Sequence, residues 1–415
     1  MITEALILLP PGGDPHPLTP LAGLSLFERA LFTAARAGAR RCYVVAGEDA
    51  ADLERSLEGK DRLAIEVVFV ARADAGAGGA DCGEGSHTLI FGADTVFHPD
   101  LVRELDQGVE DGEARAVRAP GGAYALLLAP SARLRSILAA VARGETPLVH
   151  GDANGPLGNT PVAVVSAGGR FVRRVEGTAH IRATEAALLR SLENAPRDGL
   201  VDAYVHRKIS YRISRLLLRT SLTPNQITLL SAVVALAGAA CFTAGSYAAT
   251  VTGAVLFQLS AIGDCVDGEI ARAKFLESQF GEWMDITFDA LVFIAVFLGI
   301  GVAVYRQGGV AHALALGVTL ALGALLCFPV VTFAEKTEEL GRARGGWEDR
   351  VINGMVAGLT TRDPSAVVLA FSVAAKLDWF LWGAAIGAHL FWLALAALML
   401  RSGRLLTVLR GHRTA

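Results

Sequence analysis

Charged residues are scarce in this sequence. They make up 19% of its 415 residues, whereas hydrophobic residues make up 52%. A disordered chain has far fewer apolar residues, and a purely soluble protein usually has more charge. The formal net charge is only -3, so the chain lacks the basic excess of a protein that binds nucleic acid. This composition excludes a disordered chain, predicts no nucleic-acid partner and favours a membrane protein.

Cysteine is also rare, and no secretion signal is visible. The spacing of the five cysteines fits neither a zinc site nor a disulfide framework: Cys42, Cys82, Cys241, Cys265 and Cys327. The opening MITEALILLPPGG has no basic leader and no small-residue cleavage site, so we expect no signal peptide. Both features predict a reduced chain that faces the cytoplasm.

The first 196 residues contain no apolar run of the ~20 residues that a membrane span requires. Instead, short apolar runs alternate with amphipathic stretches, in the order ALILLP, SLFERALFTAARAGA, RCYVVAG, ADLERSLEG and IEVVFVA. Further strands are expected at HTLIFG, AYALLLA and TPVAVVS, and a further helix at HPDLVRELDQG. This alternation predicts a soluble α/β domain over residues 1–196.

Residues 197–222 have a different character. Basic residues recur at helical spacing beside an apolar stripe of Val205, Ile209, Ile213 and Leu216; they are Arg207, Lys208, Arg212, Arg215 and Arg219. The pattern predicts an amphipathic helix that lies on anionic lipid at the membrane interface. The alternative is an ordinary basic helix on the surface of the soluble domain.

Long apolar segments fill residues 223–405. Six spans are predicted, at 224–244, 248–272, 281–304, 310–334, 363–377 and 379–401. With the interfacial helix in the cytoplasm, most basic residues fall in inner connections or in the tail over residues 406–415 and just before it: Lys274, Lys336, Arg342, Arg344, Arg350, Arg362, Arg401, Arg404, Arg410 and Arg413. Outer connections hold only Arg306 and Lys376. The asymmetry predicts a multi-pass protein of the inner (plasma) membrane with both termini cytoplasmic.

Four acidic residues are concentrated at the ends of the second and third predicted spans. Asp264, Asp267, Gly268 and Ala271 share one helix face, and Gly281, Asp285 and Asp289 share a face of the next helix. Consecutive antiparallel helices would present these carboxylates to each other at the same depth. Because carboxylates in a low-dielectric site need neutralising cations, the pattern predicts Mg²⁺ or Mn²⁺, with room for two ions.

Small residues and a cation complete this predicted site. Gly268, Ala271 and Gly281 remove side-chain bulk, so that a flat ligand can approach the helix backbones. Arg272 offers a permanent positive charge to a phosphate. A metal, a phosphate and a slot between helices together indicate phosphoryl chemistry at the membrane surface.

The run DCVDGEIAR, eight further residues and then GEWMDITFD resembles the signature of the CDP-alcohol phosphotransferase family, with all eight signature residues present. TPNQIT, residues 223–228, also resembles the opening of the first membrane helix in that family, and the similarity covers roughly residues 200–405. It implies a six-helix, dimeric membrane enzyme that displaces CMP from a CDP-alcohol by the hydroxyl of an acceptor alcohol. By position, Asp264, Asp267, Asp285 and Asp289 would be metal ligands and Asp289 also the general base, while Gly268, Ala271, Arg272 and Gly281 would surround the CDP moiety.

The soluble half resembles the sugar-phosphate nucleotidyltransferase fold, through PLTPLAGLSLFERALFTAARAGARRCYVVAG and LIFGADTVFHPDLV. Such a domain precedes the membrane unit in bifunctional enzymes that make CDP-inositol and transfer inositol phosphate. Asp94 matches the family's metal-binding Asp, but the loop from Pro10 to Gly23 contains no Arg or Lys for a triphosphate. We therefore expect a degenerate, silent domain, unless Arg36, Arg40 or Arg41 reaches the nucleotide.

Two further hypotheses stay open at this stage. In the first, both halves are active and the soluble half makes the CDP-alcohol from CTP. In the second, the protein is a cation-coupled transporter, although the sequence shows no internal repeat and its acids cluster at one end of the spans. The sequence does not identify the donor or acceptor alcohol. Arg362 at the start of the fifth span either contacts an acceptor phosphate or anchors the helix.

Overall fold

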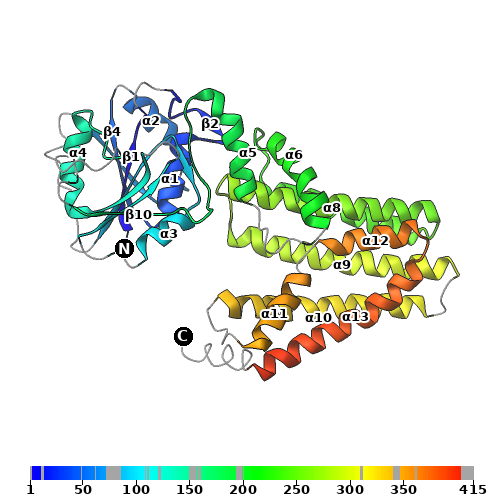
Figure 1. The fold of residues 1–415 in the computed structure, drawn as a ribbon. Coiled ribbons are helices and arrows are strands. Elements are labelled where there is room, and N and C mark those ends of the chain that lie inside the picture. The colour runs from blue at the N-terminus through cyan, green and yellow to red at the C-terminus, as the bar shows by residue number, and fades with distance from the viewer. Residues whose placement is uncertain are drawn as a thin grey trace. The chain divides into compact units, whose positions relative to one another are not determined.

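The structure is a computed structural model that describes residues 2–10, 14–47, 49–60, 62–71, 86–107, 109, 112–119, 123–148, 157, 160–192, 199, 201–308, 312–339, 346–359 and 362–402. The chain forms two compact units, Met1–Leu192 with Ala273–Phe275, and Glu193–Arg272 with Leu276–Ala415 (Figure 1). The predicted boundary at residue 196 and the predicted tail lie outside the described residues. So do Cys82, Arg342, Arg344, Arg404, Arg410 and Arg413.

The N-terminal unit is built on a seven-stranded sheet with the order β10-β8-β9-β6-β1-β4-β5. Strand β9 runs antiparallel to β6 and β8, and the other neighbouring pairs are parallel. The strands are β1 (Ile2–Leu8), β4 (Arg41–Ala46), β5 (Glu66–Ala71), β6 (His87–Gly92), β8 (Ala114–Arg118), β9 (Tyr124–Pro130) and β10 (Val162–Val165). The predicted α/β class is confirmed.

Helices cover both faces of this sheet. Alternate residues of β1 point to opposite faces: Ala5 and Ile7 pack with α1 (Leu26–Arg36), α2 (Ala50–Leu57) and α3 (Asp100–Asp106), whereas Leu6 packs with α4 (Leu134–Ala142). Helix α1 begins at a capping box in which Ser25 and Glu28 bond each other's backbone N–H groups. These layers form the core of the unit.

Several short elements of this unit were not predicted. They are β8, α4, α5 (Ile181–Ser191) and two small antiparallel pairs, β2 (Pro20–Leu21) with β3 (Leu24–Ser25) and β7 (Thr95–Phe97) with β11 (Val172–Arg174). Strand β8 reads ARAVR, and its two arginines interrupt the apolar run that identified the other strands. Strands of two or three residues depend on their pairing and leave almost no periodic signal.

The second unit is helical, and five helices among its described residues are long and apolar enough to cross a membrane. They are α7 (Pro224–Thr243), α8 (Tyr247–Ala273), α9 (Gln279–Arg306), α10 (Ala313–Glu339) and α13 (Leu377–Arg401). Helix α9 packs against α7 and α10, and α10 also packs against α13 (Figure 1). Helix α7 begins at a capping box of Thr223 and Gln226, with Pro224 in its first turn. The all-helical second unit is confirmed.

The fifth predicted span is not confirmed. Helix α12 (Asp363–Val373) has 11 residues, and at 1.5 Å per residue it rises only about 17 Å, against about 30 Å of hydrocarbon. The helix ends where Ala375 takes a positive φ of 52° and the Lys376 N–H bonds the Phe371 carbonyl at 2.9 Å. A further helix, α11 (Trp347–Leu359), lies in what was predicted to be an inner connection.

The linker region forms a π-helical turn (Asp202–His206) followed by α6 (Arg207–Leu217). Its apolar side chains Tyr204, Val205, Ile209 and Leu216 are exposed. The other face is buried and polar, because Asp202, His206, Arg207, Ser210 and Ser214 are all less than 9% exposed. Arg207 therefore does not lie on the lipid-facing side where the sequence pattern placed it.

Candidate active site

Helices α8 and α9 bring three of the four motif carboxylates together. Asp264 and Asp267 lie on the last turns of α8, and Asp285 lies on the second turn of α9. One carboxylate oxygen from each lies within 4.8 Å of the other two. The two helices run side by side here, and the rings of Phe257 and Phe293 pack edge to face at 5.8 Å. The spacing of the motif thus produces an acidic cluster between neighbouring helices.

The first membrane helix also contacts this cluster. Thr228 of α7, the last residue of TPNQIT, donates a hydrogen bond of 2.6 Å from its hydroxyl to Asp267 Oδ2. Both side chains are buried, with Asp267 only 6% exposed. Close contact of α7 with α8 is possible because the backbone at Gly263 leaves room: a Cβ there would lie 2.2 Å from Ser231 Oγ. Thr228 fixes one carboxylate oxygen of Asp267 and leaves the other for a ligand.

Asp289 lies one turn further along α9 and is not part of the three-residue cluster. Four residues along a helix correspond to about 6 Å of rise from Asp285. Its side chain shares the Asp285 face, as the i, i+4 spacing predicts. Asp289 is therefore the motif carboxylate outside the group of three whose oxygens lie within 4.8 Å of one another.

Arg362 forms an ion pair with the acidic cluster that the sequence did not predict. Its Nε contacts Asp264 Oδ2, and the two residues are 98 positions apart in the chain. Arg272 and Lys274 are the nearest bases in the sequence, but the ion pair comes from the start of α12. No sequence pattern links these two residues, since the contact depends on how α12 packs.

Arg272 and the small residues occupy the same end of α8. A Cβ at Gly268 would lie 3.3 Å from Arg272 Nη1, so the guanidinium group lies over the Gly268 backbone. Arg272 Nε is buried and has no hydrogen-bond partner among the described residues. At the start of α9, the Gly281 N–H donates to Ser278 Oγ at 3.1 Å, and a Cβ at Gly281 would lie 3.2 Å from Asn225 Oδ1. Ala271 lies one turn beyond Asp267 on the same face.

Glu269, which flanks the motif, has a structural environment of its own. It is 3% exposed and accepts hydrogen bonds from Ser210 Oγ at 2.7 Å and Ser214 Oγ at 2.6 Å. Arg207 Nη1 lies 3.3 Å from the same carboxylate. Glu269 therefore links α6 to α8, and its partners are residues of α6 instead of members of the acidic cluster.

The residues present fit a divalent cation. Asp285 Oδ1 is buried without a hydrogen-bond partner among the described residues, although a buried carboxylate oxygen normally has one. The donor set is all oxygen, as Mg²⁺ and Mn²⁺ prefer. Two oxygens on opposite sides of one Mg²⁺ lie about 4 Å apart, close to the spacing of this cluster. Asp264, Asp267 and Asp285 would hold the ion.

Asp94 of the N-terminal unit has different surroundings. It follows β6 and is 3% exposed, and its Oδ2 accepts a 2.7 Å hydrogen bond from Arg174 Nε on β11. The Thr95 hydroxyl contacts Oδ1 at 3.3 Å. Arg41, one of the basic residues considered for nucleotide binding, pairs with Glu66 at 2.9 Å. Residues 11–13 of the loop from Pro10 to Gly23 lie outside the described residues.

Comparison with known proteins finds a family match in the C-terminal part of the chain. Residues 221–409 match the CDP-alcohol phosphatidyltransferase family. A "Bifunctional IPC transferase and DIPP synthase" of Aquifex aeolicus is 30% identical over 124 residues, which cover 30% of this chain and 28% of the relative. The protein of the same name from Archaeoglobus fulgidus is 29% identical over 228 residues, or 54% of this chain and 43% of the relative. Both matches span less than half of the relative's own length.

Two nucleotidyltransferases are among the solved structures that the comparison matched. The inositol-1-phosphate CTP transferase from T. maritima is 13% identical, with a TM-score of 0.32, and the alignment covers 44% of this chain and 96% of that structure. A glucose-1-phosphate thymidylyltransferase from Bacillus anthracis is 10% identical, with a TM-score of 0.35 and coverage of 45% and 95%. The resemblance predicted for the membrane unit is confirmed by the family match over residues 221–409.

Proposed function

We propose that this protein is an integral membrane CDP-alcohol phosphotransferase. The phosphoryl group that carries the donor's alcohol forms a bond to the acceptor hydroxyl, and its bond to CMP breaks. The observation that carries the proposal is the convergence of Asp264, Asp267 and Asp285 within 4.8 Å, inside the segment that matches the family. Acids that outnumber their bases in an apolar unit favour a metal-dependent reaction over a purely structural role. The product is of the phospholipid or inositol-phosphate type.

Each residue has a proposed part in this reaction. Asp264, Asp267 and Asp285 hold Mg²⁺ or Mn²⁺, and Asp289 completes the ligand set if a second ion binds. When bound, the cation neutralises diphosphate charge and polarises the reacting phosphoryl group. Gly268, Ala271 and Gly281 leave space for the CDP moiety, and the buried Arg272 guanidinium binds phosphate oxygens.

Asp289 is the proposed general base. It lies about one helical turn from the three converging carboxylates. In that position its carboxylate can accept the proton of the acceptor hydroxyl as the new bond forms. Arg362, whose side chain is 30% exposed beside Asp264, is placed to meet an anionic group of the acceptor.

The N-terminal unit is proposed to be catalytically silent. Nucleotidyl transfer needs cations around a triphosphate, and the Pro10 to Gly23 loop has neither Arg nor Lys. Asp94, the one residue that matched a metal ligand, already bonds Arg174. The names of the bifunctional relatives favour the alternative in which both halves are active and this unit makes CDP-inositol. Pyrophosphate release from CTP and inositol 1-phosphate by the full chain would establish that alternative.

The proposed cellular setting follows from the helices and their charges. Five long apolar helices and the family match describe a multi-pass membrane protein. We place it in the inner (plasma) membrane, with the termini and the site on the cytoplasmic side, because basic residues gather in the predicted inner connections. A homodimer, as the family resemblance implies, remains a prediction.

The direct test is an assay of the purified, detergent-solubilised protein. It is incubated with Mg²⁺ or Mn²⁺, a panel of CDP-alcohols and candidate acceptors, and the products are identified by mass spectrometry. We expect equal amounts of CMP and of one phosphodiester product, formed only when donor and acceptor are both present. Asp378→Asn, on the first turn of α13, is the matched control for any site aspartate and should keep full activity. CMP formed without acceptor would indicate hydrolysis instead.

A further inference from the structure

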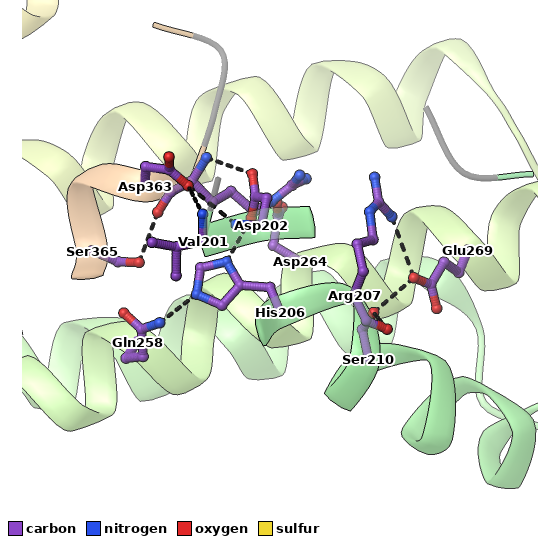
Figure 2. Close-up of polar contacts among 11 residues, drawn as sticks. Val201, Asp202, His206, Arg207, Ser210, Gln258, Asp264, Glu269, Asp363 and Ser365 are labelled. Atoms are coloured by element: carbon purple, nitrogen blue, oxygen red, sulfur yellow. Dashed lines mark hydrogen bonds and ion pairs between the residues drawn. The ribbon is translucent and has the colours of Figure 1, made fainter. Parts of the chain in front are cut away.

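A buried polar network joins the linker region to the candidate active site. Its first members lie at residues 199–214, before the segment that matches the family begins at residue 221. Figure 2 shows side chains from this region reaching α8 and the start of α12. Their contacts end at Arg362, the residue that pairs with Asp264.

Asp202 is the centre of this network. Its Oδ2 accepts a 2.8 Å hydrogen bond from the backbone N–H of Arg362, and its Oδ1 lies 2.5 Å from His206 Nδ1. The other ring nitrogen of His206 contacts Gln258 Nε2 on α8. Asp202 is 1% and His206 0% exposed, so neither contact competes with water. Burial raises the pKa of Asp202, but the hydrogen bonds from His206 and Arg362 outweigh it and keep the pKa below its ordinary value.

The network is reciprocal, because the start of α12 also binds the linker. Asp363 Oδ1 accepts the backbone N–H groups of Val201 at 3.0 Å and Asp202 at 3.1 Å. The chain comes so close at Gly199 that a Cβ there would lie 2.4 Å from Asp363 Cγ. Each segment therefore donates backbone N–H groups to an aspartate of the other, which fixes their register (Figure 2).

The contacts between the linker and the start of α12 fix the backbone of Arg362, and therefore the point from which its side chain extends. Arg362 is the N-cap residue of α12, and no side chain caps that helix end locally. Asp202 instead holds its backbone from a distant part of the chain, while Ser365 N–H and Oγ bond its carbonyl at 3.2 and 2.8 Å. Without Asp202, the N–H would lose its partner and the backbone could rotate away from Asp264.

We propose that Asp202 and His206 are positioning residues for the transferase reaction, which hold Arg362 against Asp264 where it meets the anionic group of the acceptor. His206 orients the Asp202 carboxylate and is itself oriented by Gln258. The proposal rests on the proposed function and adds to it two residues from outside the family match. It makes the linker a part of the active site.

The test is a double-mutant cycle on the full chain in detergent. Asp202→Ala should lower kcat/KM for the acceptor about tenfold to a hundredfold, the range for a lost hydrogen bond to a charged group. The KM for the CDP-alcohol should change less than twofold. Arg362→Ala should lower kcat/KM for the acceptor at least as much, and adding Asp202→Ala to it should cost less than a further twofold. Losses that multiply in the double variant would overturn the proposal.

Two more variants separate positioning from folding. His206→Gln keeps a donor for Asp202 and should retain most activity, whereas His206→Ala should resemble Asp202→Ala. Ser210→Ala with Ser214→Ala loosens α6 from Glu269 without touching Asp202, so it should leave the acceptor KM unchanged. Equal losses in all these variants would mean that the region serves folding alone.

Hydrogen exchange gives a readout that needs no activity. In the full-length protein, Asp202→Ala should speed exchange at the Arg362 amide at least tenfold, while Asp378→Asn should not. Unchanged exchange at Arg362 would overturn the positioning role, even in an active enzyme. If the wild type releases no CMP with any substrate, the proposed function fails, and the exchange experiment still decides whether Asp202 holds Arg362.

Discussion

Asp94 in the N-terminal unit and Asp264 in the helical unit each face an arginine, but among the described residues only Asp264 belongs to a group of three acids that could hold a metal ion. Asp94 bonds Arg174 and Thr95, which satisfies its buried carboxylate within the protein. Asp264 contacts Arg362, yet oxygens of Asp267 and Asp285 lie within 4.8 Å of its own. One arginine cannot neutralise three carboxylates. The comparison teaches that charge balance, and not the presence of an aspartate, distinguishes a site that needs a metal from one that does not.

The largest effect is expected for Asp289, the motif carboxylate outside the group of Asp264, Asp267 and Asp285. Asp289→Asn is nearly isosteric but cannot take up a proton as a carboxylate does. It should lower kcat about 10²- to 10⁴-fold with little change in the KM for the donor, as measured by CMP release. Turnover at the wild-type rate would show that Asp289 is not the base. A large loss of donor affinity at normal kcat would make it a metal ligand only.

Removing a ligand from the cluster should have the next largest effect. Asp285→Asn replaces the carboxylate whose Oδ1 lacks a hydrogen-bond partner among the described residues. We expect it to weaken Mn²⁺ binding at least tenfold, because a neutral amide is a much poorer ligand for a hard cation. Electron paramagnetic resonance of free Mn²⁺ measures this without any substrate. Asp94→Asn is the matched control, and an equal loss there would contradict the difference between the two sites.

The substitution Arg174→Ala tests whether the bond to Arg174 stabilises Asp94. It leaves the buried Asp94 carboxylate without its main partner, which should cost about 1–3 kcal/mol of stability in the N-terminal unit. Faster hydrogen exchange in β6 and β11 reports this loss. The tryptophans (Trp283, Trp347, Trp379, Trp382 and Trp392) all belong to the helical unit, so thermal unfolding followed by their fluorescence should be unchanged. Unaltered exchange in both strands would show that the Arg174 bond contributes little.

The smallest effect is expected when basic residues of the linker are changed and binding to anionic lipid is measured. Its basic residues differ in burial: Lys208 and Arg212 are exposed and Arg215 half-buried, whereas Arg207 bonds Glu269. Changing the first three to Gln should weaken binding to vesicles with anionic lipid by about 1 kcal/mol per charge. Gln at Arg133, Arg135 and Arg182 of the N-terminal unit is the matched control. If activity depends on the anionic lipid content in the same way in both variants, the basic residues of the linker have no role at the membrane interface.

The sequence predicted those parts of the site that depend on spacing along one helix. Asp264 and Asp267, three residues apart, necessarily share a face of α8, and Gly281, Asp285 and Asp289 share a face of α9. The contacts that it could not predict join distant segments. Arg362 with Asp264, and Ser210 and Ser214 with Glu269, follow from how α12 and α6 pack on α8, which no periodicity encodes. Helix α11 lies in a segment that the sequence analysis assigned only to an inner connection.

The N-terminal unit likewise has features that the sequence predicted and contacts that it did not predict. Runs such as RCYVVAG and HTLIFG are buried on both faces, and their continuous apolar character identified β4 and β6 correctly. The neutralisation of Asp94 by Arg174 was not foreseen, since β11 carries only three residues and pairs with β7 through tertiary context. Sequence reasoning thus identified the strand before Asp94 but not the partner that changes its chemistry.

We propose that the acids of α8 and α9 form a metal-dependent transferase site. The decisive experiment measures CMP release by the purified protein against free Mg²⁺ or Mn²⁺ concentration in a chelator-buffered series. We expect no CMP release in excess chelator, full recovery on adding back either cation, and a shift of the activation curve to higher Mn²⁺ in Asp285→Asn. CMP release at the full rate in excess chelator would contradict it.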